Sequence, residues 1–525
     1  MFLRDFVARC ANGYPEKTAF IHRDTRRSWR DMHERSERLA AAMQSLGVHK
    51  GHNTAMLARN RIELAEHWFA CLKTGIVRTA VNWRYSQREM LHTIRDCDAK
   101  LILIDSGCME TIAGDLDDLR REGRILVGFG PGHGLEHDYE TLLAAHPGPA
   151  TYPPLAESEI AMIGYTSGTT GLPKGVLISQ GALRDSMVHI ALYSTYRAED
   201  VRLYVTNPAG INIFQMCFNL VTGMTTVVDD YETNRFLELV EEHRVTAVTL
   251  IPTMLTRILD VLKTGHHDVS SLRQIVYGTM PSTASLIRSA YGTLGCTFLQ
   301  LYGASESVGP VAGLRDPDHK RAIAGEPELL TSIGRPMLNA DISVRDDEGR
   351  VVPTGETGTV WIRSDSLMSG YLNLPDETAE ALVMSADGSK VEWLRTGDYG
   401  RLDGRGYIYL GDRKKHMIIS GGMNVFPAGV ESALAEHASV AEVVVVGVPH
   451  PEWGEAVVAV VSLSNGASAT QEELIAHCKS RVAKWETPKY IEIVDELPQG
   501  HTHKLDKREV ARRLRDSGRL PWNVS

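Results

Sequence analysis

The stretch that decides the fold is Tyr165-Thr-Ser-Gly-Thr-Thr-Gly-Leu-Pro-Lys-Gly175, and two short apolar runs, 160–164 and 176–178, flank it. Apolar runs of this length, bounded by turn residues, are typical of buried strands. Three glycines let the backbone approach a ligand closely, four hydroxyl groups can donate to phosphate oxygens, and Lys174 adds a positive charge. The sequence therefore predicts two strands joined by an anion-binding loop, with phosphate as the natural ligand.

Other interpretations of the glycine-rich sequence are weaker. A plain flexible turn would have no use for four hydroxyls in five positions. A Walker A loop requires Gly-x-x-x-x-Gly-Lys-Ser/Thr, whereas Lys174 precedes the last glycine here. A second glycine-rich stretch, 128–134, has its third glycine out of register for a dinucleotide-binding turn, and Pro131 would disturb that turn. We therefore interpret 128–134 as a surface loop.

The composition around this loop is that of an ordinary folded protein. The chain has 525 residues, of which 43% are hydrophobic and 23% are charged, so it can form several hydrophobic cores. Lys and Arg number 56 against 66 Asp and Glu, which gives a net charge of −10, and no basic run is present. Nucleic acid is therefore not an expected partner.

The sequence also indicates where the protein works. Charged residues interrupt the apolar residues of the first ten positions, unlike the core of a secretory signal. The longest apolar runs, near 443–448 and 456–463, are much shorter than the roughly 18 residues of a membrane-spanning helix. Seven scattered cysteines fit reduced thiols. We expect a cytoplasmic protein with no membrane span and no disulfide.

Alternating helical and strand patterns predict an α/β fold. Helical spacing between 28 and 89 leads to an apolar strand at 101–104, and strands followed by helices recur at 247–251 and 274–277. Between 331 and 410 short strands alternate with glycine turns, which predicts a small β region.

A separate domain follows. Beyond 411 the sequence has apolar runs at 443–446 and 456–461, with helices expected near 430–438 and 472–482. The short charged connector Gly411-Asp-Arg-Lys-Lys-His416 predicts a hinge. We therefore expect a large N-terminal domain, 1–411, of layered α/β sheets plus the small β region, and a small mobile α/β domain, 412–525.

A series of motifs gives the chain a family resemblance. In order, they are Tyr302-Gly-Ala-Ser-Glu306, Tyr371 after Gly370, Thr396-Gly-Asp398, Gly411-Asp-Arg-Lys-Lys415, Ser420-Gly-Gly-Met-Asn424, Gly447-Val-Pro-His-Pro-Glu-Trp-Gly454, and Leu497-Pro through Lys504. Together with the phosphate loop, they make nearly the whole chain resemble the adenylate-forming (ANL) superfamily, in its acyl-CoA synthetase branch. In that family a carboxylate attacks ATP to give an acyl-adenylate and pyrophosphate, and a thiol then displaces AMP to give a thioester.

The resemblance implies ATP or acyl-AMP, Mg²⁺ and coenzyme A as ligands, and a role for each matching residue. Lys174 and the loop hydroxyls would hold the β- and γ-phosphates, Glu306 would reach Mg²⁺, and Asp398 would accept hydrogen bonds from the ribose hydroxyls. The nucleotide-binding residues would be Thr166, Ser167, Gly168, Thr169, Thr170, Gly171, Gly278, Thr279, Met280, Tyr302, Gly303, Ala304, Ser305, Asp398 and Arg413.

The small domain would supply the mobile parts of the site. Lys504 would stabilise the charge that develops at the α-phosphate, and Lys415 would be the hinge about which the domain rotates between the two steps. The coenzyme A channel would contain Gly421, Gly422, Trp453, Trp485 and, as the weakest candidate, Arg84.

The chain departs from the family pattern at four places. His503 replaces the glycine before Lys504, His416 replaces the usual aspartate after the hinge, and Thr279 and Met280 stand where small residues are usual. The usual Pro-Leu-Phe-His of the acyl pocket reads Pro208-Ala-Gly-Ile211, which removes an aromatic ring and a histidine. The acyl-pocket residues would be Asn207, Ala209, Gly210 and Ile211. Smaller groups leave more volume, so we expect a bulky, largely apolar acid.

Three enzymatic interpretations remain open. The first is a full two-step acyl-CoA ligase. The second is a ligase in which the changes near His503 and in 278–280 impair adenylation, so that it accepts acyl-AMP from a separate adenylating enzyme. The third is a stand-alone adenylation enzyme that loads a carrier protein. A homodimer is possible with each of them. His501 and His503 lack suitably spaced partners for zinc, and a non-enzymatic binding protein on the same fold has the least support.

Overall fold

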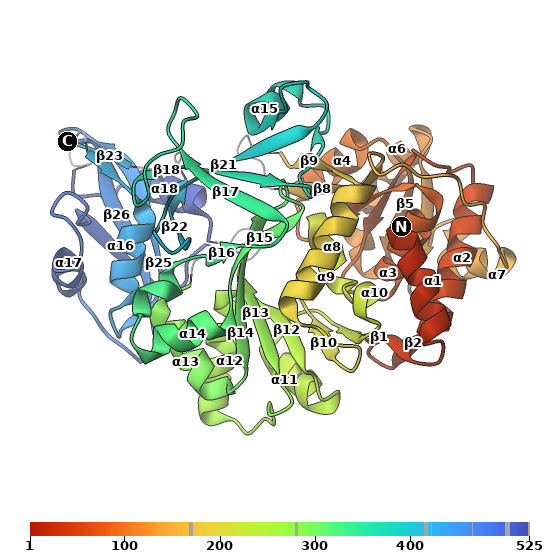
Figure 1. Cartoon of the computed structure of the whole chain (residues 1–525), viewed down its shortest axis with the longest axis horizontal. Helices are drawn as coiled ribbons and strands as arrows, with labels where there is room; N and C mark the ends of the chain where they lie inside the picture. The colour runs from red at the N-terminus through yellow and green to blue at the C-terminus, as the bar shows by residue number, and fades with distance from the viewer. Residues whose placement is uncertain are drawn as a thin grey trace.

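Parallel strands with nearly continuous apolar sequence form the centre of each large sheet. The structure is a computed structural model that describes residues 1–166, 172–278, 282–413, 418–421, 423–464, 466–498 and 505–522. Such strands are buried on both faces, as in β13, where every residue is buried. Figure 1 shows the two large sheets side by side, with a small sheet above them and the C-terminal part at the left.

The first sheet has nine strands in the order β16-β15-β14-β13-β12-β10-β11-β1-β2. In this order they are Arg335–Pro336, Gly309–Leu314, Thr297–Ala304, Gln274–Gly278, Ala247–Leu250, Val201–Tyr204, Thr225–Val228, Thr18–His22 and Thr25–Ser28. The central strands pair in parallel, and helices join them. The helices of this part are α11 (Thr233–Glu242), α12 (Pro252–Thr264), α13 (Ala284–Leu294) and α14 (Asp316–Ala324).

The second sheet has eight strands in the order β19-β9-β8-β4-β3-β5-β6-β7. In this order they are Gly370–Tyr371, Lys174–Ser179, Ile160–Thr166, Val77–Val81, Asn53–Leu57, Ala99–Asp105, Ile125–Phe129 and His137–Asp138. Its helices are α1 (Leu3–Gly13), α2 (Trp29–Ser45), α3 (Glu63–Thr74), α4 (Gln87–Asp96), α5 (Met109–Ile112), α6 (Leu116–Arg121) and α7 (Tyr139–Ala145).

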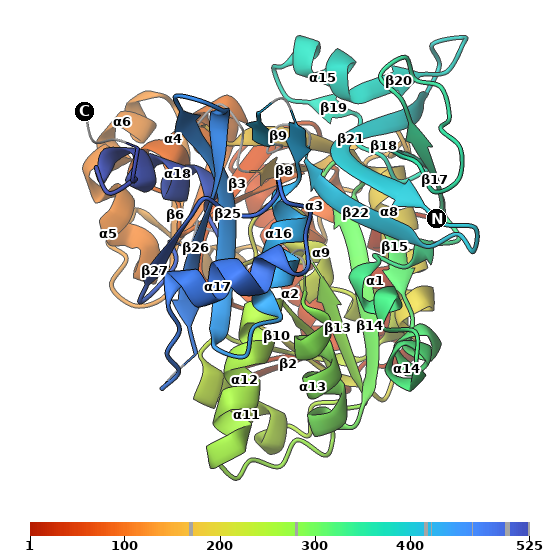
Figure 2. The ribbon, with the colours of Figure 1, turned by 90° about the vertical axis from the view of Figure 1, so that its left-hand side faces the viewer.

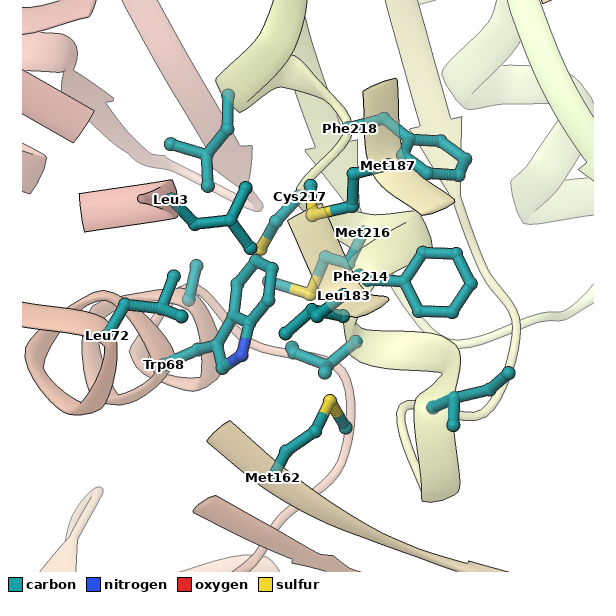
Figure 3. Close-up of a cluster of buried hydrophobic side chains, with 14 of the residues drawn as sticks. Leu3, Trp68, Leu72, Met162, Leu183, Met187, Phe214, Met216, Cys217 and Phe218 are labelled. Atoms are coloured by element: carbon teal, nitrogen blue, oxygen red, sulfur yellow. The ribbon is translucent and has the colours of Figure 1, made fainter. Parts of the chain in front are cut away.

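Helices fill the space between the two large sheets. They include α8 (Gln180–Ser194), the short η3 (Gly210–Asn212), α9 (Ile213–Met216) and α10 (Asn219–Thr222). Every residue of α3 after Glu63 is buried, as expected of a helix enclosed on all sides. Figure 3 shows the core here, where Trp68 of α3 meets Met162 of β8, Leu183 of α8 and Met216 of α9.

A small sheet and a C-terminal layer complete the fold. The small sheet contains β17 (Ala340–Arg345), β18 (Thr357–Ser364), β20 (Leu382–Met384), β21 (Val391–Leu402) and β22 (Ile408–Arg413), with α15 (Pro375–Ala381) beside it. The C-terminal sheet contains β23 (Ile418–Ser420), β24 (Met423–Val425), β25 (Val440–His450), β26 (Gly454–Leu463) and β27 (Tyr490–Val494), and its helices are α16 (Pro427–Ala435), α17 (Gln471–Lys479) and α18 (Lys507–Asp516). Figure 2 shows this layer in front of the large sheets.

The predicted α/β class with a large N-terminal and a small C-terminal part is confirmed. The strand expected at 101–104 is β5, and the apolar runs 443–446 and 456–461 lie in β25 and β26. The domain boundary at 411 and 412 stays a prediction, since β22 continues to Arg413 before the undescribed residues 414–417. All seven cysteines are free and buried. Within the described ranges, no helix has the length and hydropathy that a membrane crossing requires.

Candidate active site

The predicted phosphate loop joins two strands of one hairpin. Strands β8 and β9 pair antiparallel, and their register places Thr166 opposite Lys174 at the open end of the hairpin. The prediction of a strand on each side of the loop is therefore confirmed. Ser167, Gly168, Thr169, Thr170 and Gly171 lie outside the described residues, so their role as phosphate ligands stays a prediction.

A chain of contacts links Lys174 to the residue expected at Mg²⁺. The Lys174 ammonium lies 5.7 Å from the centre of the Tyr371 ring, and the Tyr371 hydroxyl donates to Oε1 of Glu306 over 2.8 Å. Strand β19, which contains Tyr371, pairs with β9 and so brings this ring to the hairpin. Three predicted motifs thus meet at one place, and the Glu306 carboxylate offers the oxygen atoms that Mg²⁺ prefers.

Glu377 is a site neighbour that the sequence analysis missed. Its Oε1 lies 3.6 Å from Nζ of Lys174, and it is in the first turn of α15. The pair is partly exposed, so it adds little stability. No local motif marks Glu377, because its position depends on how α15 packs after β19. A bound phosphate would compete with this carboxylate for Lys174.

The motif expected to bind ribose meets the 302–306 motif through one short hydrogen bond. The Tyr302 hydroxyl donates to Oδ2 of Asp398 over 2.5 Å, which joins β14 of the nine-stranded sheet to β21 of the small sheet. The Asp398 backbone N–H donates to Oγ1 of Thr396 over 3.0 Å, and this orients the Asp398 turn. Asp398 is also the strand partner of Arg413, as the resemblance implies.

Backbone packing explains the glycines of the expected adenine region. A Cβ atom at Gly278 would lie 2.2 Å from the carbonyl oxygen of Leu301, and one at Gly303 would lie 2.1 Å from that of Gly309. Side chains are therefore excluded where β13, β14 and β15 meet. Ala304 and Ser305 are partly exposed beside Gly303. Thr279 and Met280 lie outside the described residues.

Two buried hydroxyl groups that the sequence analysis missed support this region. Ser307 accepts a hydrogen bond from the backbone N–H of Ala304 over 2.9 Å and donates to the carbonyl of Gly309 over 2.7 Å. Tyr277 precedes Gly278, and its hydroxyl oxygen lies 2.9 Å from Nε2 of His319. Nδ1 of His319 lies 2.9 Å from the carbonyl oxygen of Arg315, so Nδ1 carries the proton and Nε2 accepts from Tyr277.

The expected acyl-pocket segment, 207–211, is fixed by amide hydrogen bonds. Asn207 donates from Nδ2 to Oδ1 of Asn82 over 2.7 Å and accepts from the backbone N–H of Ala209 over 3.1 Å. Gly210 has a φ of +60°, and a Cβ atom there would lie 3.1 Å from the carbonyl oxygen of Tyr165. The small residue at 210 therefore serves close packing against β8, while Ile211 is 9% exposed.

Arg84 lies near this segment. Its backbone N–H donates to Oδ1 of Asn82 over 3.0 Å, the same oxygen that binds Asn207. Its guanidinium stacks 4.1 Å from the centre of the Trp83 ring, with Arg59 on the same ring at 4.7 Å. Burial lowers the pKa of Arg84, and the nearby Asp230 carboxylate opposes this shift. A coenzyme role for Arg84 stays a prediction.

In the C-terminal part, two expected coenzyme A residues are in contact. The backbone N–H of Gly421 donates to the carbonyl of Trp453 over 2.9 Å, and Gly421 has a φ of +59°, which favours glycine. The Trp453 ring stacks on His450 at 4.2 Å, and the ammonium of Lys489 lies 4.5 Å from its centre. The sequence analysis gave no role to His450, which belongs to the motif 447–454, or to Lys489. Trp485 is 47% exposed.

The remaining predicted residues cannot be placed. Lys504, His503, Lys415, His416 and Gly422 lie outside the described residues. Their expected roles as catalytic lysine, hinge and channel glycine therefore stay predictions. The structure places Arg413 only by its backbone, at the end of β22.

Comparisons with known proteins show the family of the chain. The family model described as "AMP-binding enzyme" matches residues 7–372, and the model "AMP-binding enzyme C-terminal domain" matches 429–504. Feruloyl-CoA synthase from an Amycolatopsis species is 33% identical over 98% of this chain and 99% of its own length.

Two solved structures are similar over almost the whole chain. The amide bond synthetase McbA from Marinactinospora thermotolerans has a TM-score of 0.85 and 29% identity, with 97% of this chain and 99% of that chain covered. The o-succinylbenzoate CoA synthetase MenE from Bacillus subtilis, in complex with the acyl-adenylate intermediate OSB-AMP, has a TM-score of 0.80 and 27% identity, with 96% and 97% covered.

Proposed function

Because the chain belongs to the AMP-binding enzyme family, among its AMP-forming acid–CoA ligases, we propose that it joins a bulky, largely apolar carboxylic acid to coenzyme A in two steps. One observation carries the proposal. The hydrogen bonds Tyr302–Asp398 and Tyr371–Glu306 gather residues of separate motifs from three sheets around the β8–β9 hairpin. Motifs without a shared role would have no reason to converge there.

In the first step, an oxygen of the acid carboxylate attacks the α-phosphorus of ATP, and the bond to pyrophosphate breaks. Thr166 and Lys174 flank the loop that would hold the leaving phosphates, and Lys504 would offset the charge at the α-phosphate. Glu306 would hold Mg²⁺, whose chemistry here is to neutralise phosphate charge. Asp398 would fix the ribose and thereby the distance between the two reacting groups.

In the second step, the thiol of coenzyme A attacks the acyl carbon, and AMP leaves. Gly421 and Trp453 would line the path of the pantetheine arm, and a backbone hydrogen bond holds the two residues together. A side chain at 421 would be strained by the positive φ, while its Cβ would be in ordinary van der Waals contact with Trp453, 3.8 Å away. Rotation about Lys415 would change which face of the C-terminal part is turned toward the active site.

Adenylation is the step that the changes at His503 and in 278–280 would impair, so it needs a direct test. The test is pyrophosphate–ATP exchange with a panel of free acids and no coenzyme A, and we expect exchange with at least one bulky acid. A chain that accepts only preformed acyl-AMP shows no exchange but forms thioester from synthetic adenylates. His503→Gly is the informative variant, since it restores the residue that is usual in the family and should raise exchange only if His503 impairs this step.

The acceptor in the second step needs its own test. The likeness to an amide bond synthetase makes an amine the main rival to coenzyme A. With acyl-AMP supplied, we expect release of AMP to accelerate with coenzyme A and not with a panel of amines or a carrier protein. Gly421→Val should abolish the coenzyme A effect while pyrophosphate exchange continues. Equal acceleration by an amine in both proteins would contradict the assignment.

A further inference from the structure

Arg78 of β4 is a charged side chain in an apolar interior. It has no exposed surface, yet Nε and both terminal nitrogens of its guanidinium have no hydrogen-bond partner among the residues that the structure describes. The guanidinium has five N–H donors. Burial lowers its pKa to about 10, which still leaves it charged at neutral pH. An unpaired buried charge is unfavourable, so a missing partner is the simplest explanation.

Among the residues that the structure describes, no carboxylate offsets this charge. Cys71, Cys217, Tyr204 and His67 act electrostatically on Arg78. Burial raises the pKa of the two thiols and of the tyrosine and lowers the pKa of His67, so all four groups are neutral. Two other cations in the described part of the chain are fully buried, and both have partners, although Nε of Arg202 has none. Lys73 lies 2.8 Å from Oε1 of Glu37, and Arg202 donates to the carbonyl of Gln215 and, over 2.9 Å, to Thr249.

Arg78 lies behind the expected acyl pocket. Its neighbour Tyr204 has its hydroxyl 3.3 Å from the carbonyl oxygen of Asn207 and 3.2 Å from that of Asn212, and its neighbour Cys217 directly follows α9. The unpaired guanidinium therefore borders the segment 207–217, which contains all the predicted acyl-pocket residues.

A second unpaired donor lies at the same place. Nε1 of Trp68 is buried and has no acceptor among the described residues. Figure 3 shows the Trp68 ring beside Cys217 and Met216, with Met162 on its other side. Met162 is the strand partner of Arg78, so the two donors border one region. His67, which acts electrostatically on Arg78, has a buried Nδ1 without a partner, but an imidazole nitrogen has no charge to offset the guanidinium. What this region lacks among the described residues is an anionic acceptor.

We propose that Arg78 binds a second carboxylate at the far end of the acid, so that the substrates are dicarboxylic acids with a largely apolar middle. The inference rests on the proposed function and names its substrate class. A carboxylate can accept two parallel hydrogen bonds from a guanidinium, and Trp68 offers a third donor. The apolar middle of the acid would lie along the pocket segment.

Access requires side chains to move, because Arg78 has no exposed surface. Met162 and Met216 border the region, and both are unbranched and fully buried. Methionine adapts to new shapes at low cost, so these two can make room for a substrate end. Binding of a diacid should therefore be accompanied by their repacking.

The test compares acids that differ only at the far end: octanoic with octanedioic acid, and 3-phenylpropionic with 3-(4-carboxyphenyl)propionic acid. We expect the specificity constant for pyrophosphate exchange, or for thioester formation from the corresponding adenylates, to favour the diacid by at least 100-fold. Arg78→Met should reverse this preference, Arg78→Lys should retain part of it, and Trp68→Phe should reduce it several-fold. Each preferred diacid should also raise the melting temperature of the wild-type protein and not that of Arg78→Met.

Controls separate this inference from the proposed function. Arg202→Lys changes a neighbouring but paired cation and should leave the diacid preference unchanged. Equal use of monoacids and diacids by the wild type, or an unchanged preference in Arg78→Met, refutes the inference while the ligase function stands. If neither acid class supports either step, both proposals fail. Without ligand, Arg78→Met should melt at a higher temperature than the wild type, so it provides a folded variant.

Discussion

At the scale of single residues, the site consists of side chains held in place by partners from other parts of the fold. Tyr302 holds Asp398, Tyr371 holds Glu306, and Glu377 lies beside Lys174. The first two pairs join motifs that the sequence identifies separately. In each of these two pairs, the carboxylate residue, Asp398 or Glu306, should contact the ligand, and the tyrosine should orient that carboxylate.

Asp398 should determine the affinity for ATP. Asp398→Ala removes the expected hydrogen bonds to the ribose, and hydrogen bonds to a charged group contribute about 1.5–3 kcal/mol. We expect the KM for ATP in pyrophosphate exchange to rise about 10- to 100-fold, with a smaller change in kcat. Tyr302→Phe is the control, since it keeps the carboxylate and removes only its partner. A larger loss in Tyr302→Phe would contradict the assignment.

Glu306 should determine the requirement for Mg²⁺. Glu306→Gln keeps the shape and the acceptor oxygen but removes the charge, so the Mg²⁺ concentration at half-maximal exchange should rise at least 10-fold. Tyr371→Phe leaves the Glu306 charge in place and should shift this concentration much less. The measurement is a Mg²⁺ titration at saturating ATP. Identical titrations for Glu306→Gln and the wild type would exclude a role at the metal.

At the scale of elements, the sequence predicted those strands and glycine positions that a local sequence pattern determines. The hairpin strands, β5 and the apolar parts of β25 and β26 follow from runs of apolar residues, and the glycines follow from motif spacing. Glu377, Ser307 and His319 could not be predicted, since their roles depend on packing between distant segments. The same holds for Gly210, where a missing side chain suggested extra volume and the backbone instead packs against Tyr165.

Gly278 should be required for pairing of β13 with β14. Gly278→Ala places a methyl group against the Leu301 carbonyl, so the strands must separate, and we expect the free energy of unfolding to fall by several kcal/mol. Gly292→Ala in α13 is the matched control, since nothing lies within 4 Å of a Cβ there. It should raise stability by up to about 1 kcal/mol. Urea unfolding measures both.

His319 should make stability depend on pH. Burial lowers its pKa below the ordinary 6.5, so the unfolded chain binds the proton more tightly than the folded one. Neutral His319 makes its full contribution to the free energy of unfolding above pH 6.5. This contribution is lost as the pH falls below 6.5, by at most about 1.4 kcal/mol per pH unit. His319→Gln should show a shallower fall between pH 6.5 and 5. Parallel curves for the two proteins would contradict this.

At the scale of the whole molecule, the C-terminal part faces α12. Burial raises the pKa of Glu442 in β25, and Arg257 in α12 opposes that shift, so the two side chains are near each other across the expected domain boundary. This pair allows the proposed rotation to be tested, because a covalent tether between the two positions would hold the N-terminal and C-terminal parts in one arrangement.

A tether between positions 257 and 442 should separate the two steps. In Arg257→Cys/Glu442→Cys, a short bismaleimide should react selectively, since all seven native cysteines are buried and burial raises the pKa of their thiols. We expect one half-reaction to continue and the other to fall at least 10-fold. Each single-cysteine variant serves as a control. Unchanged overall turnover after complete cross-linking would contradict rotation.

The convergence of three sheets at the expected nucleotide site should also affect how the molecule unfolds. Thr166 and Lys174 belong to the eight-stranded sheet, Tyr302 to the nine-stranded sheet and Asp398 to the small sheet. A nucleotide held by all of them binds only when the three sheets are formed together, so its binding energy is lost if any one opens. ATP should therefore act as a cooperative clamp that suppresses partial unfolding and protects all three sheets from proteolysis at once.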